Sequence, residues 1–406
     1  MTKHSVALPM PKGEFVALMA MMFATIAFSI DAMLPALTVI GLELSPKDPH
    51  NAALIITSFV LGMGVGTFFT GPLSDAFGRR RVMFSGAALY IAAATVAYFS
   101  RSLELMLLAR LVQGLGAAGP RVVSVAIMRD LFSGREMARI LSIVMIIFTL
   151  IPAFAPAMGL AIINLAGWRA IFGAFVVFSV ICVLWLGLRL PETLPAEERR
   201  PIRLPLMIDA VRQMFAHPMV RISIFAQTLA MAMLFSLLTL VQPIYDIVFD
   251  KAETFPYWFG AIALASGAAS LLNAVIVGKF GMRRLVTAAL GAQVICSGLM
   301  ILSFGYAGPY SFALFAGWQF LLFAQAGLTV GNLNAIAMEP MGHIAGMAAS
   351  VVGAFSTVFA AAIASPIGLL FDGTIRPLIL AVFAFAVLGL LLMLRMARVE
   401  RRLSGK

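Results

Sequence analysis

Asp31 is a single carboxylate inside an otherwise apolar run that extends from Phe15 to Ile40. Because a helix that crosses the hydrocarbon core needs about 20 mostly apolar residues, this run is predicted to span a membrane. A charge in the middle of such a helix costs roughly 3 kcal/mol on insertion scales, so the protein must use it or neutralise it. Another apolar run contains two arginines, Arg110 and Arg121. Charges of both signs inside the predicted helices indicate a protein that moves a solute across the membrane.

Arg110 is followed three residues later by Gln113, which puts both side chains on one face of a helix. An arginine does not lose its proton in a protein, so Arg110 must face a carboxylate, carbonyl groups, water or a ligand rather than lipid. We predict that Asp31 carries a transported proton, because an apolar cavity favours the neutral acid and approach of Arg110 favours the carboxylate. The alternative is a permanent ion pair between Asp31 and Arg110.

A second group of charged residues follows the second apolar run, in the segment 71–81 with the sequence GPLSDAFGRRR. Its glycines, Gly71 and Gly78, allow a tight turn and close approach of helices. Asp75 can cap a neighbouring helix N-terminus or pair with a basic side chain. A basic turn between two helices would explain the arginines, but not Asp75 and the glycines together.

The fifth apolar run contains two prolines four residues apart, Pro152 and Pro156, followed by Gly159. Each proline removes an amide donor and bends a helix, and the glycine lets another helix approach. We predict that this segment takes part in a rocking or gating motion. The alternative is a kink that the helix merely tolerates.

The composition agrees with a membrane protein. Of the 406 residues, 62% are hydrophobic and 12% are charged, and the mean hydropathy is +1.00. No soluble domain of this length could bury that much apolar surface. We therefore predict an all-α membrane protein with twelve transmembrane helices. The predicted spans are 15–40, 52–74, 82–99, 103–127, 140–163, 170–190, 219–246, 256–278, 285–306, 309–337, 344–370 and 376–396.

The net charge of +11 is distributed unevenly over the loops. An even number of spans places both termini on one side, and the loops on that side carry most of the lysines and arginines. This asymmetry follows the positive-inside rule, so both termini are predicted to be cytoplasmic and the charge does not indicate nucleic-acid binding. The basic residues of the opposite side are Lys47, Arg101, Arg169, Lys251 and Arg376.

The two halves of the chain repeat each other. The sequence FGRRR at 77–81 is echoed by FGMRR at 280–284, and Pro156 is echoed by Pro366. Matches at nearly one offset indicate duplication of a six-helix unit, a recurring plan among secondary transporters.

One long polar stretch, 191–218, separates these halves. We predict two pseudo-symmetric six-helix bundles, an N-terminal one of residues 1–190 and a C-terminal one of residues 219–406. The stretch between them is predicted to be a cytoplasmic linker. Within it, residues 206–215 are expected to form a short amphipathic helix on the membrane surface.

These motifs resemble those of the major facilitator superfamily (MFS), and within it the twelve-helix drug:proton antiporters. The segments 29–37 (SIDAMLPAL) and 127–132 (IMRDLF) resemble the bicyclomycin/chloramphenicol resistance (Bcr/CflA) branch most closely. The resemblance spans the whole chain, and its sharpest motifs lie in the first half. The chain departs from the family pattern at Ala76, where a basic residue is usual, and the fifth-helix motif lacks its usual second glycine.

The resemblance implies functional roles for several of the residues above. Asp75, Arg79 and Arg129 would form a charge relay on the cytoplasmic side that stabilises the outward-facing state. The proline and glycine of the fifth helix would match the antiporter motif, and Arg110 the fourth-helix arginine that is tied to proton coupling. The residues expected to act in conformational change are Gly71, Asp75, Gly78, Arg79, Arg129, Pro156 and Gly159.

The substrate cavity is expected to include Asp31 and Gln113 and to draw on seven helices of the two bundles. The other candidates are aromatic and amide side chains within the spans, each of which is individually more often ordinary helix packing. The chain's 25 methionines suit an adaptable apolar pocket. These other candidates are Phe28, Phe148, Phe154, Phe235, Gln242, Tyr245, Trp318, Asn332 and Asn334.

We therefore expect a secondary active transporter of the bacterial inner membrane that exports small amphipathic drugs or toxic metabolites in exchange for protons, by alternating access. The alternative is a proton-coupled importer, or an exporter dedicated to one metabolite. A primary pump or an enzyme is not indicated, because the sequence has neither a GxxxxGK[ST] loop nor clustered His, Cys or acids inside the spans. No cofactor or metal is expected. A monomer should suffice, since one chain holds both halves of the pathway.

Overall fold

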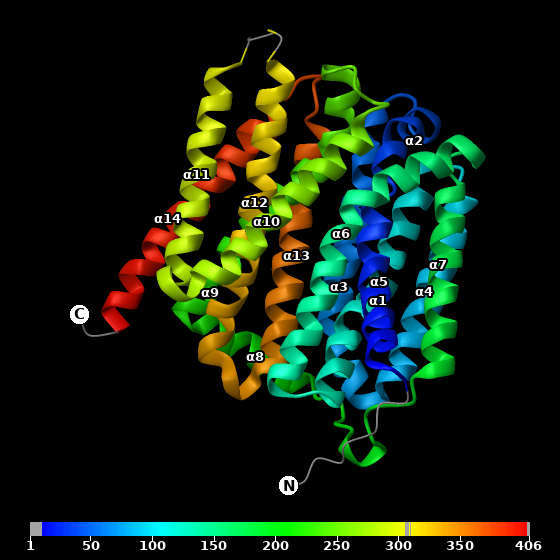
Figure 1. Cartoon of the computed structure of the whole chain (residues 1–406), viewed down its shortest axis with the longest axis vertical. Helices are drawn as coiled ribbons and strands as arrows, with labels where there is room; N and C mark the ends of the chain where they lie inside the picture. Colours follow the sequence, from blue (N-terminus) through cyan, green and yellow to red (C-terminus); the bar gives the residue numbers. More distant parts are fainter. Residues whose placement is uncertain (1–9, 305–307, 309, 404–406) are drawn as a thin grey trace.

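The chain folds almost entirely into long α-helices that lie side by side, as Figure 1 shows. The structure is a computed structural model and describes residues 10–304, 308 and 310–403. Within these residues, eleven stretches are long and apolar enough to cross a membrane, and one of them, Ser311–Leu369, contains two helices. The prediction of twelve spanning helices is thus confirmed.

The predicted spans match these helices to within a few residues at most ends. The predicted limits at 306 and 309 lie outside the described residues. The first crossing is composite and consists of α1 (Lys12–Asp31), the short 3₁₀ turn η1 (Leu34–Ala36) and α2 (Leu37–Leu44). The other crossings are η2 (Pro49–Ala53) with α3 (Leu54–Phe77), α4 (Arg79–Tyr98), α5 (Leu103–Leu131), α6 (Gly134–Ala166), α7 (Ala170–Arg189), α9 (Pro218–Pro243) with the π turn η4 (Ile244–Val248), α10 (Phe255–Phe280), α11 (Met282–Leu302), α12 (Ser311–Met338), α13 (Ala345–Leu369) and α14 (Arg376–Leu403).

The helices form two bundles, α1 to α7 on the right of Figure 1 and α9 to α14 on the left. The connection between them, which contains α8 (Leu204–Ala216), lies at the lower end of the molecule, where α1 also begins. We call this end the linker face and the opposite end, which bears α2, the far face. The domain limits at 190 and 218 stay a prediction, although α7 ends at Arg189 and α9 begins at Pro218.

The first crossing is broken because of Pro35. A proline has no amide hydrogen, so it cannot bond the carbonyl group four residues earlier, which here belongs to Asp31. The α-helix ends at Asp31, and a turn followed by η1 carries the chain into α2. The break leaves the last carbonyl groups of α1 in need of partners from elsewhere in the protein.

The bundles meet along two seams, where glycines let the backbones approach. In one seam α3 packs against α13, and a Cβ atom built at Gly64 would lie 2.7 Å from the side chain of Val358. In the other α6 packs against α10, and a Cβ atom built at Gly260 would lie 2.3 Å from the carbonyl oxygen of Ala153. On the far face α9 also contacts η1 and α2.

The repeated glycines predicted to mark equivalent turns adopt equivalent conformations. Gly78 joins α3 to α4 with φ +97°, and Gly281 joins α10 to α11 with φ +80°. Both angles lie in a region that residues with a Cβ atom rarely adopt. The two halves thus turn in the same way after their second helices.

The amphipathic helix predicted at 206–215 is present as α8. One face of α8 is buried and includes Met207, Ala210 and Met214. Leu204 and Ile208 are exposed despite being apolar, as expected for a helix that lies at a membrane surface.

Candidate functional site

Asp31 is the last residue of α1, at the break in the first crossing. Only 5% of its surface is accessible, and among the described residues its carboxyl group has no hydrogen-bond or ion-pair partner. An unpaired charge in such surroundings is costly. Asp31 is therefore nearly enclosed by protein, without a permanent counter-charge.

Arg110 is fully buried on α5 and is stabilised without any carboxylate. Its Nη2 donates to the carbonyl oxygen of Ser29 at 3.0 Å, and its Nη1 donates to Oε1 of Gln113 at 2.8 Å. Its guanidinium carbon lies 4.3 Å from the centroid of the Phe59 ring, a cation–π contact. The permanent ion pair between Arg110 and Asp31, weighed as an alternative, is absent among the described residues.

The break in α1 explains this arrangement. Ser29 lies in the last turn of α1, where carbonyl groups lack partners within the helix. The negative end of the helix dipole also lies there. The carbonyl group of Ser29 is thus a good acceptor for a buried cation. The side chain of Ser29 also shares a hydrogen bond of 2.5 Å with the hydroxyl group of Tyr90 on α4. The residue connects three helices around Arg110.

Gly159 brings α6 against the same break. A Cβ atom at this position would lie 1.9 Å from the carbonyl oxygen of Ala32, the residue after Asp31. Only glycine permits that approach, so the two backbones are in direct contact. Pro156 is buried one turn earlier on α6. The two residues expected to act in conformational change on the fifth span therefore lie beside the carboxyl-bearing turn.

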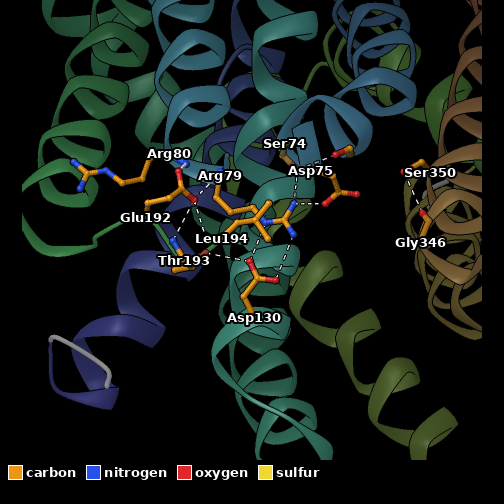
Figure 2. A network of polar contacts seen from close by, with 11 residues as sticks. Ser74, Asp75, Arg79, Arg80, Asp130, Glu192, Thr193, Leu194, Gly346 and Ser350 are labelled. Carbon is orange, nitrogen blue, oxygen red and sulfur yellow. Dashed lines mark hydrogen bonds and ion pairs between the residues drawn. The ribbon is translucent and has the colours of Figure 1, made fainter. Parts of the chain in front are cut away.

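The charged residues at the linker face form a compact network, drawn in Figure 2. The buried side chain of Arg79 pairs with Asp75 and with Asp130, to which its Nε donates at 2.9 Å. Its Nη1 also donates to Oγ of Ser74 at 2.8 Å. The network ties the end of α3 and the start of α4 to the end of α5.

Arg129 does not belong to this network. It is exposed, and among the described residues it has no hydrogen-bond or ion-pair partner. The neighbouring Asp130 takes the place that the family resemblance assigned to Arg129, because its side chain is the one that faces Arg79. In this conformation the ion pairs join Arg79 to Asp75 and Asp130, and the relay role expected of Arg129 stays a prediction.

Glu192, just after α7, completes the network. Its carboxylate accepts from the backbone amides of Arg79 at 2.9 Å and of Arg80 at 3.1 Å. These amides belong to the first turn of α4, where the helix dipole also favours a negative charge. A built Cβ atom at Gly78 would lie 2.6 Å from Oε2 of Glu192, so the glycine leaves room for the carboxylate.

The predicted lining residues are not brought together in one pocket. Most of them are buried within their own bundle. Phe28 packs against the rings of Phe175 and Phe178. Three further candidates form hydrogen bonds within the C-terminal bundle. The hydroxyl group of Tyr245 donates to Oε1 of Gln319 at 2.9 Å, and Nε1 of Trp318 donates to Oγ of Ser297 at 3.0 Å. Nδ2 of Asn332 donates to Oδ1 of Asn273 at 2.7 Å.

Four other candidates lie elsewhere in the structure. Phe235 is buried on α9, and Phe148 is half-buried near Phe23. Phe154 and Asn334 are exposed.

Gln242 lies at a contact between the bundles on the far face. Its Oε1 accepts a hydrogen bond of 2.7 Å from the hydroxyl group of Thr38 on α2. Beside this bond is a mostly apolar cavity of about 170 Å³, which His50 and Phe371 also line. The bond holds α2 and α9 together at this end of the molecule.

Several residues of the site were not predicted from the sequence. Asp130 and Glu192 are ordinary acids next to basic segments, and only their position beside Arg79 distinguishes them. Thr38 and Tyr90 lie in apolar runs, where a single hydroxyl group is common. One sequence signal could have identified this network: Asp130 is the one acid at the end of the fourth predicted span.

Comparison with known proteins supports the sequence resemblance. A family model described as Major Facilitator Superfamily matches residues 15–366. A bicyclomycin resistance protein homolog of Haemophilus influenzae is 27% identical over 365 residues, which cover 90% of this chain and 91% of that protein. The multidrug resistance protein MdtL of Escherichia coli is 32% identical over 167 residues, 41% of this chain and 42% of MdtL.

Among solved structures, the crystal structure of a D-xylose-proton symporter superposes with a TM-score of 0.74 at 15% sequence identity. The match covers 93% of this chain and 97% of the symporter. At this identity the likeness concerns the fold alone.

Proposed function

Since this chain belongs to the Major Facilitator Superfamily and is a transporter rather than an enzyme, we propose that it exports small amphipathic molecules in exchange for protons. The observation that carries the proposal is Asp31, a nearly enclosed carboxyl group without a partner in the middle of the first crossing. The names of two relatives, a bicyclomycin resistance homolog and a multidrug resistance protein, support drugs or toxic metabolites as the exported class.

Asp31 is the proton carrier in this proposal. Burial of an unpaired carboxylate costs far more than burial of a neutral carboxylic acid. Asp31 therefore holds a proton in the conformation described here. A change in its surroundings that admits water or a cation stabilises the carboxylate and releases the proton.

Arg110 and the broken helix provide such a change. The guanidinium group rests on the carbonyl oxygen of Ser29, two residues before Asp31. At Gly159 the backbone of α6 contacts the backbone of Ala32, the residue that follows Asp31. A movement of α6 relative to α1 alters both the enclosure of Asp31 and its separation from Arg110. In this proposal, transport of the substrate and release of the proton depend on the same rearrangement.

The linker face is assigned to the cytoplasm, because it bears most of the basic residues outside the membrane. The protein then lies in the bacterial inner membrane with both termini inside the cell. In the conformation described here the bundles are joined on the periplasmic side, where Thr38 bonds Gln242. One chain contains both bundles, so a monomer is the functional unit.

The test uses membrane vesicles and a panel of dyes and amphipathic antibiotics. In everted vesicles, the proposal predicts accumulation of panel members when the vesicle interior is made acidic. Asp31→Asn is expected to abolish this accumulation, because the amide cannot carry a proton. Asp209→Asn, at an exposed position on α8, is the control and should transport normally.

Two results contradict this proposal. One is proton-driven accumulation by Asp31→Asn at the wild-type rate. The other is uptake of panel members only into right-side-out vesicles. This result would make the protein an importer, which is the alternative function that the sequence analysis left open.

A further inference from the structure

Arg121 is a charged residue within α5 to which the proposed function gives no role. Its side chain is exposed, and among the described residues it has no hydrogen-bond, ion-pair or aromatic-ring partner. Ionisable residues within membrane helices are rare and commonly mark the path of a substrate or ion. An arginine at this depth without a protein partner needs another explanation than fold stability.

The position of Arg121 on α5 shows where its side chain points. Arg121 follows Arg110 by eleven residues, about three helical turns or 16 Å, so both lie on the same side of the helix. The neighbouring faces of α5 are occupied. Ala118 packs against Gly66 on α3, Gly119 approaches Val82 on α4, and Val122 approaches Gly71 at the seam with α13. Arg121 is left on the side that faces the interior of the transporter, nearer the linker face than Arg110.

Arg121 is accessible although its neighbours on the same side of α5 are buried. Ala117 and Ser124, one helical turn before and after Arg121 on the same side of α5, are both fully buried by protein. A side chain that faced lipid would be accessible but would have protein on one side only. Accessibility combined with enclosure is expected of a cleft between the bundles. The main contacts of α9 with the other bundle are with η1, α2 and α3.

Among the described residues, no carboxylate forms an ion pair with Arg121. Four acids of the N-terminal bundle near the linker face already have basic partners. These pairs are Glu14 with Arg189, Asp75 and Asp130 with Arg79, and Glu136 with Lys12. Asp31 lies beside the residue that binds Arg110, about three turns farther from the linker face.

We propose that Arg121 binds an anionic group of the exported substrate, so that the transporter takes amphipathic organic acids such as carboxylates. An arginine offers a planar pair of donors that matches a carboxylate. The methionines and aromatic residues of the spans suit the apolar body of such a molecule. This inference rests on the proposed function, because it names the substrate class of that same transport path.

The anion also links binding to closure. When the bundles close at the linker face, Arg121 loses its water, and an unpaired cation there opposes closure. A bound carboxylate replaces the water and allows the bundles to close. Export of one anion against one inward proton moves two positive charges inward, so the membrane potential drives both halves of the exchange.

The experiment measures equilibrium binding of two matched pairs of probes to the purified full-length protein. The pairs are 4-phenylbutyrate with 4-phenylbutanamide and octanoate with octanamide, each radiolabelled and measured at fixed pH and salt. Wild-type protein is expected to bind at least one carboxylate about tenfold more tightly than its amide. Arg121→Gln is expected to remove this preference, and Arg121→Lys to retain part of it. Arg135→Gln, an exposed cation at the start of α6, is the control and should keep the preference.

Equal binding of acid and amide by the wild-type protein in both pairs would overturn the inference. So would an undiminished preference in Arg121→Gln. The melting temperature of each variant shows whether it is folded, and the amides provide a binding signal that does not depend on Arg121.

The failure of this inference and that of the proposed function can be distinguished. Acid-driven accumulation of neutral dyes in everted vesicles, without a preference for carboxylates, refutes the anion site alone. A carboxylate preference without proton-driven accumulation refutes antiport and leaves the anion site standing.

Discussion

Arg110 and Arg79 are both buried arginines, but the protein stabilises them in different ways. Arg110 has a backbone carbonyl, an amide oxygen and an aromatic face around it. Arg79 has two carboxylates and a serine hydroxyl group. The first arrangement leaves a nearby acid, Asp31, without a basic partner among the described residues. The second holds helices together, because one cation on α4 pairs with carboxylates on α3 and α5.

This difference predicts the effect of removing Arg79. Arg79→Gln leaves Asp75 and Asp130 without their cation. The pair with Asp130 is the more buried one, and removing one partner of a buried ion pair typically costs about 3 kcal/mol. We expect a clear fall in the melting temperature of the purified protein. Arg81→Gln, two residues away and exposed, should melt like the wild type. Equal melting temperatures of the two variants would contradict the structural role of Arg79.

A milder change tests the surroundings of Arg110. Arg110→Lys keeps the charge but loses the planar fork that bonds Ser29 and Gln113 together, and it loses stacking on Phe59. Proton-coupled transport is expected to fall at least tenfold while the protein stays folded. A lysine variant with wild-type transport rates in everted vesicles would show that charge alone suffices.

Single residues were predictable from the sequence only where their type was unusual for their place. Asp31, Arg110 and Gln113 could be recognised because polar groups are rare within spans. The carbonyl group of Ser29 as a partner for Arg110 could not, since every residue has a carbonyl group and only the break at Pro35 makes this one available. Asp130 was missed in favour of Arg129 because the orientation of adjacent side chains at a helix end depends on tertiary packing.

Helices are the next scale, and here glycines set how closely they approach. Gly159 touches the backbone at Ala32, whereas Gly291 on α11 has no atom within 4 Å of a built Cβ position. Gly159→Ala therefore forces α6 away from α1, and overpacking of this kind typically costs about 1–3 kcal/mol. Gly291→Ala should be neutral or slightly stabilising, because alanine favours a helix. Melting temperatures and transport rates of the two variants check this contrast.

If both variants behaved alike, direct contact between α6 and α1 would not matter. The same would follow if Gly159→Ala transported at the wild-type rate.

The contact between α2 and α9 predicts a shift in conformation. Thr38→Val keeps the shape of the side chain but removes the hydrogen bond to Gln242, and a hydrogen bond contributes about 1 kcal/mol net. The population open on the far face is therefore expected to rise about fivefold. The measurement is alkylation of Leu240→Cys, which lines the far-face cavity, in a protein without Cys182 and Cys296.

Thr239→Val is the matched control, because Thr239 lines the same cavity but bonds within its own helix, to Ser236. Unchanged alkylation in Thr38→Val, or an equal increase in both variants, would mean that the bond to Gln242 does not hold the far face closed.

At the scale of elements, hydropathy predicted the helices well, because twenty apolar residues in a row have few alternatives in a membrane. It did not predict that the first crossing is broken into α1, η1 and α2. Hydropathy was a poorer guide to the residues that line a cavity, because it does not tell which face of an apolar helix points inward. Tyr245 and Trp318, for example, contribute to hydrogen bonds within the C-terminal bundle.

The whole molecule consists of two halves with the same turn after their second helices but different charges. Arg79 pairs with two acids in the N-terminal half, whereas Arg283 in the corresponding turn pairs with Glu400 near the chain end. The two charges of the proposed transport path, Asp31 and Arg121, both belong to the N-terminal half. Under the two proposals above, proton and anion chemistry belong to one bundle, and the other supplies apolar surface and the far-face contact at Gln242.

The central claim, that Asp31 takes up and releases a proton, is tested most directly by infrared difference spectroscopy of the purified protein while the pH is cycled. A reversible carboxylic acid band is expected in the wild type and in Asp209→Asn and is expected to be absent in Asp31→Asn. Identical difference spectra for wild type and Asp31→Asn would contradict this claim, because Asp31 would then not change its protonation.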